Sequence, residues 1–145
     1  MDINTVYNID NLDFLKQIPD CCIDLIVTSP PYSDLRKYKG FTWDFEAIAF
    51  ELKRCLKPDG FICWNEASSF MKKDSSIIPF KHLLFFVEQV GLTHHETLIY
   101  AKKTTCPGMS VKYKNSHEYV FVFSKTKNKN KNLIKRKTKN NGIKK

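Results

Sequence analysis

The most chemically distinctive stretch of the sequence is T-S-P-P-Y, residues 28–32, which directly follows an apolar run. Proline has no N–H group and fixes its own φ angle, so Pro30 and Pro31 hold a stiff backbone whose carbonyl oxygens can accept hydrogen bonds. Ser29 adds a hydroxyl acceptor, and Tyr32 adds a flat face on which a ring can stack. Two acceptors beside an aromatic platform suit a planar ligand that carries an exocyclic amine.

An exocyclic amine on cytosine or adenine is a poor nucleophile because its lone pair is delocalised into the ring. Acceptors for both of its N–H protons favour a pyramidal nitrogen that can attack in line, and the expected electrophile is a methyl group on a sulfonium. Catalysis would then come mainly from positioning the two reactants. A base in a duplex would first have to flip out, and stacking on Tyr32 would return roughly 1–3 kcal/mol of that cost. The alternative interpretation is a polyproline-like turn without a reactive role.

The flanking elements determine where this stretch lies. Ile23–Thr28 reads as a strand buried on both faces, and helices are expected over residues 11–18, from an Asp44 cap to about Leu56, and over residues 79–90. Further strands are expected over residues 5–9, 61–66, 92–101 and 118–124. The alternation predicts an α/β fold with a mostly parallel sheet, and the last two strands, joined without a helix, predict an antiparallel edge.

Ligands bind at the carboxyl ends of the strands in open α/β sheets, which is where Ser29 follows its strand. Asn65 and Glu66 end the next predicted strand on the same side of the sheet. These two polar residues either line the same pocket or are simply solvated. No arrangement of His or Cys residues predicts a metal site.

The net charge of +9 is confined to the end of the sequence. Residues 125–145 contain ten Lys and Arg residues and no acidic residue, and Lys alternates with Asn through much of this segment. Such a segment has almost nothing to bury, so we expect a disordered tail after an ordered domain over residues 1–124. The tail either binds phosphates electrostatically, without sequence preference, or only increases solubility.

The remaining composition indicates a reduced cytoplasmic protein. The five cysteines form no C-x-x-C pair, and their odd number argues against a disulfide framework. The first ten residues lack the basic and apolar regions of a signal peptide, and no apolar run is long enough to span a membrane. A single domain of 145 residues can bury a substantial core.

The sequence resembles the DNA amino-methyltransferases, which modify cytosine N4 or adenine N6. T-S-P-P-Y resembles their motif IV, and three further segments resemble the family in the same order: Y-N-I-D-N-L-D-F-L-K-Q-I before it, then L-K-P-D-G-F-I and H-E-Y-V-F-V-F-S-K. The resemblance covers about residues 5–125. It implies a partial Rossmann-like methyltransferase fold, S-adenosylmethionine (SAM) as the cofactor and double-stranded DNA as the substrate. The serine in the first position of the motif favours cytosine N4 over adenine N6 as the target atom.

Carried over by position, the resemblance implies that Ser29, Pro30 and Tyr32 hold and stack the target base. Pro31 matches a scaffold residue of the same motif. Asp10 matches an acidic residue that lies near the adenosine part of the cofactor. The loop after the motif offers three basic residues that either contact DNA phosphates or are simply solvated: Arg36, Lys37 and Lys39.

The sequence departs from the family in one respect. The family's glycine-rich cofactor motif, F-x-G-x-G, is absent, because the five glycines never form G-x-G. The segments therefore follow the circularly permuted order, in which the catalytic half comes first. The chain is expected to be a catalytic half that is a fragment, one subunit of a split enzyme with a second polypeptide carrying the glycine-rich motif, or an inactive remnant that binds nucleic acid.

Overall fold

The computed structural model of the chain describes residues 4–31, 43–67, 77–102 and 117–127. Its helices and strands follow in the order α1 (Asn11–Gln17), β1 (Ile23–Thr28), α2 (Phe45–Cys55), β2 (Leu56–Glu66), α3 (Ile78–Glu88), β3 (Thr93–Ala101) and β4 (His117–Ser124). All three predicted helices are present, and so are four of the five predicted strands. β2 is longer than predicted, because its pairing with β1 begins at Leu56.

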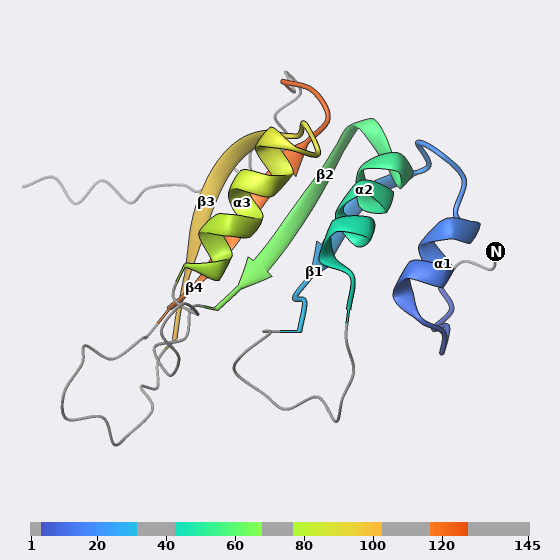
Figure 1. The fold of residues 1–145 in the computed structure, drawn as a ribbon, viewed down its shortest axis with the longest axis horizontal. Coiled ribbons are helices and arrows are strands. Elements are labelled where there is room, and N and C mark those ends of the chain that lie inside the picture. The colour runs from blue at the N-terminus through green and yellow to red at the C-terminus, as the bar shows by residue number, and fades with distance from the viewer. Residues whose placement is uncertain (1–3, 32–42, 68–76, 103–116, 128–145) are drawn as a thin grey trace, which may run out of the picture.

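The four strands form one mixed sheet in the order β1-β2-β4-β3 (Figure 1). β1 is parallel to β2, with α2 between them in the chain, whereas β4 is antiparallel to both β2 and β3. The predicted α/β fold is therefore confirmed. The sheet is mixed, and its antiparallel part is larger than the antiparallel edge that the sequence predicts for a mostly parallel sheet, because β4 inserts between β2 and β3.

Local sequence signals explain where the helices begin and end. Asp10 caps α1 by accepting hydrogen bonds from two backbone N–H groups, and Asp44 caps α2 in the same way through Ala47 N. Pro79 lies in the first turn of α3, where its missing N–H removes no helical bond. Gly91, with φ at +72°, reverses the chain after α3.

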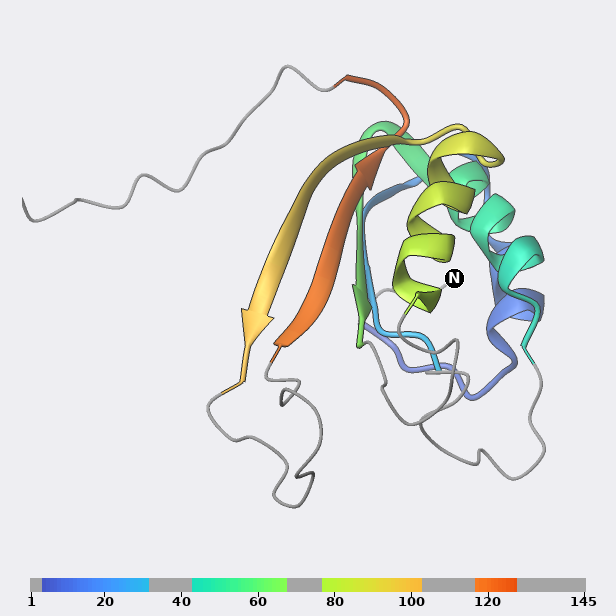
Figure 2. The ribbon, with the colours of Figure 1, turned by 60° about the vertical axis from the view of Figure 1, so that its left-hand side comes forward.

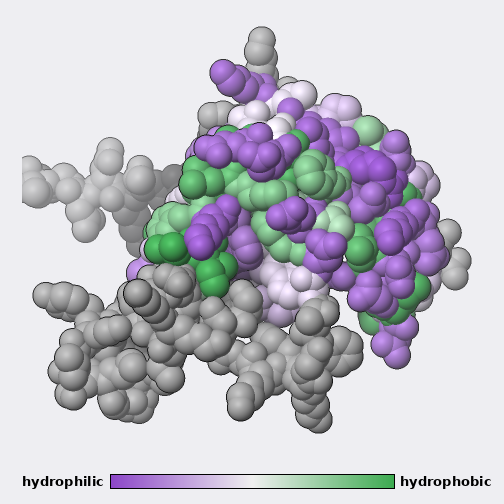
Figure 3. Space-filling view, viewed as in Figure 1, coloured by the Kyte–Doolittle hydropathy of each residue, from purple (hydrophilic) through white to green (hydrophobic). Residues whose placement is uncertain are grey.

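All three helices lie on the same face of the sheet (Figure 2). The core between these two layers is largely aromatic and aliphatic, and its largest members are fully buried: Trp64, Phe86, Phe121 and Phe123. Figure 3 views the outer side of this helical layer, where hydrophilic side chains alternate with apolar ones. Burial against one face of the sheet thus stabilises the described part of the chain.

The opposite face of the sheet carries no helix within the described ranges; we call it the open face. Leu25 and Val27 point to it from β1 and are 57% and 70% exposed, so the prediction that this strand is buried on both faces is wrong. The register pairs Leu25 with Phe61 and Val27 with Cys63, which extends the apolar surface onto β2. The physical reason is that a strand is buried twice only when a second layer covers it.

The predicted strand over residues 5–9 does not form; these residues belong to no helix or strand. β1 is the outermost strand on this side of the described sheet, and it pairs only with β2. Residues with high strand propensity remain irregular when no neighbouring strand accepts their backbone hydrogen bonds.

The predicted disordered tail lies mostly outside the described residues, which end at Lys127. The division into a domain over residues 1–124 and a tail therefore stays a prediction. No helix in the described part of the chain is long and apolar enough to cross a membrane.

Candidate active site

The T-S-P-P-Y motif begins at the edge of the sheet where β1 and β2 both end. Thr28, the last residue of β1, pairs with Trp64 of β2. Ser29 therefore follows at the carboxyl end of its strand, next to Asn65, as the parallel pairing requires. Pro30 is buried and Pro31 half-buried, whereas Ser29 is exposed.

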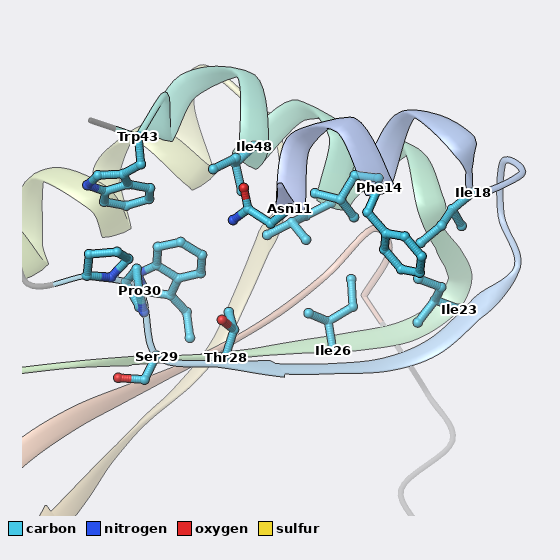
Figure 4. Close-up of a pocket in the computed structure, with 14 residues that line it drawn as sticks. Asn11, Phe14, Ile18, Ile23, Ile26, Thr28, Ser29, Pro30, Trp43 and Ile48 are labelled. Carbon is cyan, nitrogen blue, oxygen red and sulfur yellow. The ribbon is translucent and has the colours of Figure 1, made fainter. Parts of the chain in front are cut away.

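A cavity of about 370 Å³ adjoins the motif on the helical side of β1 (Figure 4). Its lining comes from the motif, from the indole rings of Trp43 and Trp64, and from α1, α2 and β1: Asn11, Phe14, Leu15, Ile18, Ile23, Ile26, Thr28, Ser29, Pro30, Pro31, Trp43, Ile48, Leu52 and Trp64. Its size and its mainly apolar lining are those of a small-molecule or planar-ring pocket.

Strand alternation separates the two polar residues at the end of β1. Thr28 points into the cavity, whereas the side chain of Ser29 points away from it (Figure 4). The hydroxyl of Ser29 lies 3.4 Å from Nδ2 of Asn65. The cavity and the Ser29 hydroxyl are thus on opposite sides of the strand end, with the Pro30 backbone between them.

A rigid aromatic cluster supports this edge of the sheet. The rings of Trp43 and Trp64 stack with centroids 6.3 Å apart, and Phe45 stacks on His82 at 3.8 Å. Beneath them, the buried carboxylate of Glu66 accepts a hydrogen bond from the indole Nε1 of Trp64 at 2.9 Å. The same carboxylate contacts Nδ1 of His82.

Glu66 therefore does not share the surroundings of Ser29. It is 2% exposed and faces the helical layer, whereas Asn65 faces the open side and contacts the Ser29 hydroxyl. Of the two polar residues at the end of β2, only Asn65 meets the motif. Neither is a simply solvated strand end.

Asp10 lies at the start of α1, and its neighbour Asn11 lines the cavity. The Asp10 carboxylate accepts hydrogen bonds from Leu12 N at 2.9 Å and from Asp13 N at 3.3 Å. Both bonds end on Oδ1, and the residue is exposed, so Oδ2 is accessible to a ligand hydroxyl. The structure thus gives Asp10 a role in capping the helix, which the family resemblance did not indicate.

Four of the predicted site residues lie outside the described part of the chain, so their positions are not given: Tyr32, Arg36, Lys37 and Lys39. Other residues join the site without having been predicted from the sequence. Trp43 and Asn11 line the cavity, and Glu118 and Lys102 connect to Asn65. The polar H-E at the start of the last predicted strand was a usable signal for Glu118, because β4 begins at the edge where β2 ends.

Comparison with known proteins places this geometry in context. A family model described as DNA methylase matches residues 23–145. The orphan methyltransferase M.BamHII of Bacillus amyloliquefaciens is 41% identical over 104 residues, which make up 72% of this chain and 39% of the relative. The chain thus spans about two fifths of that relative.

Two solved structures are similar in fold. The PvuII DNA methyltransferase, described as cytosine-N4-specific, superimposes with a TM-score of 0.68 at 24% identity, over 84% of this chain and 49% of that one. The complex of M1.HpyAVI with SAM gives a TM-score of 0.58 at 17% identity, over 86% of this chain and 55% of that one. These likenesses confirm the predicted partial Rossmann-like methyltransferase fold.

Proposed function

Because the chain belongs to the DNA methylase family, we propose that it is the catalytic portion of a DNA methyltransferase. The methyl group moves from SAM to the exocyclic amine of a base flipped out of double-stranded DNA, with cytosine N4 favoured over adenine N6. The observation that carries this proposal is the position of Ser29, Pro30 and Pro31 at the carboxyl end of β1, with an exposed hydroxyl beside a buried proline.

In this mechanism the residues of the motif orient and activate the amine. Ser29 Oγ and the Pro30 carbonyl accept its two N–H protons, which localises the lone pair on nitrogen for in-line attack. Tyr32 stacks on the base, and the stiffness of the two prolines keeps both acceptors in position while the nitrogen becomes positively charged. SAM supplies the electrophilic methyl group when it is bound.

The described residues fit only part of a cofactor site. Asp10 offers Oδ2 as an acceptor for a hydroxyl group of the cofactor, next to the cavity that Asn11 lines. A glycine-rich turn, which lets a backbone approach a ligand closely, is absent from the sequence. Most contacts to the cofactor must therefore come from elsewhere.

A second polypeptide that carries the glycine-rich motif would supply those contacts. The open face and β1 support this proposal, because Leu25 and Val27 expose apolar side chains beside an edge strand. Exposed apolar surface and unpaired strand edges are typical of surfaces that another polypeptide covers. The chain also accounts for only 39% of the length of M.BamHII.

The basic residues after the motif are assigned to the DNA backbone: Arg36, Lys37 and Lys39. The basic tail is a second source of phosphate contacts, and it leaves from the other end of the sheet, since β4 runs antiparallel to β2. An inactive methylase remnant that binds nucleic acid through this tail is the alternative function. DNA binding by either route should weaken as the salt concentration rises.

The experiment is methyl transfer to DNA by the chain mixed with a polypeptide that carries F-x-G-x-G, taken from the adjoining reading frame. Digestion to nucleosides followed by mass spectrometry identifies the product. We expect N4-methylcytosine; N6-methyladenine would overturn the base preference. DNA binding without methyl transfer under any of these conditions would favour the inactive remnant.

A further inference from the structure

A row of polar side chains crosses the open face at the carboxyl end of β2, directly behind Ser29. Asn65 Nδ2 lies 3.4 Å from Ser29 Oγ and 2.8 Å from Oε2 of Glu118. The other oxygen of Glu118 pairs with Nζ of Lys102 at 2.5 Å. The row thus connects residues at the ends of all four strands, from β1 through β2 and β4 to β3.

Glu118 determines which end of the Asn65 amide faces Ser29. An ionised carboxylate only accepts hydrogen bonds, whereas an amide has an NH₂ donor end and an oxygen acceptor end. The carboxylate therefore holds the Nδ2 end of Asn65 through a charge-assisted hydrogen bond. One N–H of Nδ2 is directed at Glu118 and the other at Ser29 Oγ.

Lys102 and the sheet keep the carboxylate in place. The Glu118 side chain is only 13% exposed and forms the ion pair with Lys102 at the end of β3. Glu118 also pairs with Tyr100 across the β3–β4 ladder, and Asn65 pairs with Val120 across the β2–β4 ladder. The ion pair between Glu118 and Lys102 thus fixes the NH₂ end of Asn65.

We propose that Asn65 is a positioning residue that sets the hydrogen-bond polarity of Ser29; this inference rests on the proposed function. The Asn65 N–H donates to Ser29 Oγ and so orients this oxygen at the strand end, where the same oxygen would accept an N–H of the target amine.

The same arrangement limits what the row can do. An amide neither takes up nor releases a proton near neutral pH, so Asn65 cannot pass the proton that the amine loses on to Glu118. The row orients Ser29 and does not conduct protons. If the amide were reversed, its oxygen would face Ser29, and the Ser29 hydroxyl would donate to Asn65 instead of accepting from it. Ser29 would then present different hydrogen-bonding groups to the base.

The first test uses the chain by itself and needs no activity. In ¹⁵N-labelled protein, the side-chain NH₂ signals of Asn65 are assigned by their loss in Asn65→Ala. Ser29→Ala removes one of their acceptors, and Glu118→Gln replaces the charged acceptor with a neutral amide, so each variant should shift these signals. The matched control, Glu96→Gln, removes an exposed carboxylate on β3 outside the row and should leave them unchanged. Unshifted signals in a folded Glu118→Gln variant would overturn the proposal.

The second test measures methyl transfer by the complex with the polypeptide that carries F-x-G-x-G. Asn65→Ala should lower kcat by up to about 100-fold, the loss expected from a misplaced acceptor, while the KM for DNA changes little. Asn65→Asp cannot donate when ionised but can when protonated, so its activity should rise as the pH falls while that of the wild type does not. A loss in Asn65→Asp that does not depend on pH would contradict the proposal. If the wild-type complex transfers no methyl group, the proposed function fails, and the NMR result alone decides on the amide.

Discussion

Gly60 and Asp24 lie so close together that no side chain fits between them. A Cβ atom on Gly60 would lie 2.9 Å from the carbonyl oxygen of Asp24 and equally close to that of Ile23. The pairing of β1 with β2 has an irregular register at this place, between Ile23 and Leu25. Gly60 thus allows the two strands to approach at the start of the ladder that ends at Thr28, directly before Ser29.

Gly60→Ala should lower the free energy of unfolding by about 1–3 kcal/mol, the usual cost of inserting a methyl group into closely packed surroundings. The backbone oxygens cannot move aside without breaking the pairing of β1 with β2. Urea unfolding followed by circular dichroism measures the loss. Glu88→Ala, at an exposed position of α3, is the control and should change stability by less than about 0.5 kcal/mol. Equal stability of the two variants would contradict the close approach.

Substitutions of Asp10 separate its capping role from its proposed role in cofactor binding. Asp10→Ala should cost about 0.5–2 kcal/mol of stability, because the N–H groups of Leu12 and Asp13 lose their acceptor. Asp10→Asn keeps the cap, since asparagine is an equally good N-cap residue, but it removes the charge. We expect Asp10→Asn to unfold like the wild type and to weaken SAM binding in the assembled complex. Unchanged SAM affinity, measured by calorimetry, would leave Asp10 with the capping role only.

The stability of the chain should fall at alkaline pH because of a buried thiol. Burial raises the pKa of Cys55 above its ordinary value. A cysteine thiol in an unfolded chain ionises at about pH 8.5, so above this pH the unfolded state loses a proton that the folded state keeps. The free energy of unfolding therefore decreases as the pH rises toward the folded pKa, by at most about 1.4 kcal/mol per pH unit.

Urea unfolding in the presence of a reductant, at about pH 7 and about pH 9.5, measures this effect. Cys55→Ala is less stable at both values because it leaves a small cavity, but its stability should change less between them. The same pH dependence in Cys55→Ala and in the wild type would show that this thiol does not contribute.

Cys63 reports on the open face. It lies beside Val27 and Val122 on that face, and burial raises the pKa of its thiol. Its alkylation should therefore be slow at neutral pH and faster at alkaline pH. A polypeptide that covers the open face should protect Cys63 but not Cys21 or Cys22, which are exposed at the other end of β1. Peptide mass spectrometry resolves the three sites, and equal protection of all of them would argue against docking on this face.

Much of the fold could be predicted from the sequence because its signals are local. Asp44 caps its helix as expected, Gly91 follows the end of α3, and the apolar run over Ile23–Thr28 is a strand. The position of β4 between β2 and β3 could not be predicted in this way. Strand order depends on contacts between distant parts of the chain, and periodicity carries no information about them.

The errors in burial have a related cause. The sequence of β1 is apolar on both of its sides, which predicts a strand between two layers, but Leu25 and Val27 are exposed. A strand is buried on both faces only where a layer covers each face, and the described part of the chain has only one helical layer. The contacts among Asn65, Glu118 and Lys102 could not be predicted from the sequence for another reason. Asn65, Glu118 and Lys102 come from three separate segments and meet only through the strand pairing.

In the proposed mechanism, Ser29 holds the amine of the target base. The most direct measurement is the rate of methyl transfer from SAM to DNA by the assembled complex, compared between wild type, Ser29→Ala and the control Glu96→Gln. Loss of an acceptor for the nitrogen that becomes positively charged predicts a rate about 100-fold or more lower for Ser29→Ala, with normal folding and DNA binding, and an unchanged rate for the control. Wild-type rates in Ser29→Ala would contradict the assignment of the site.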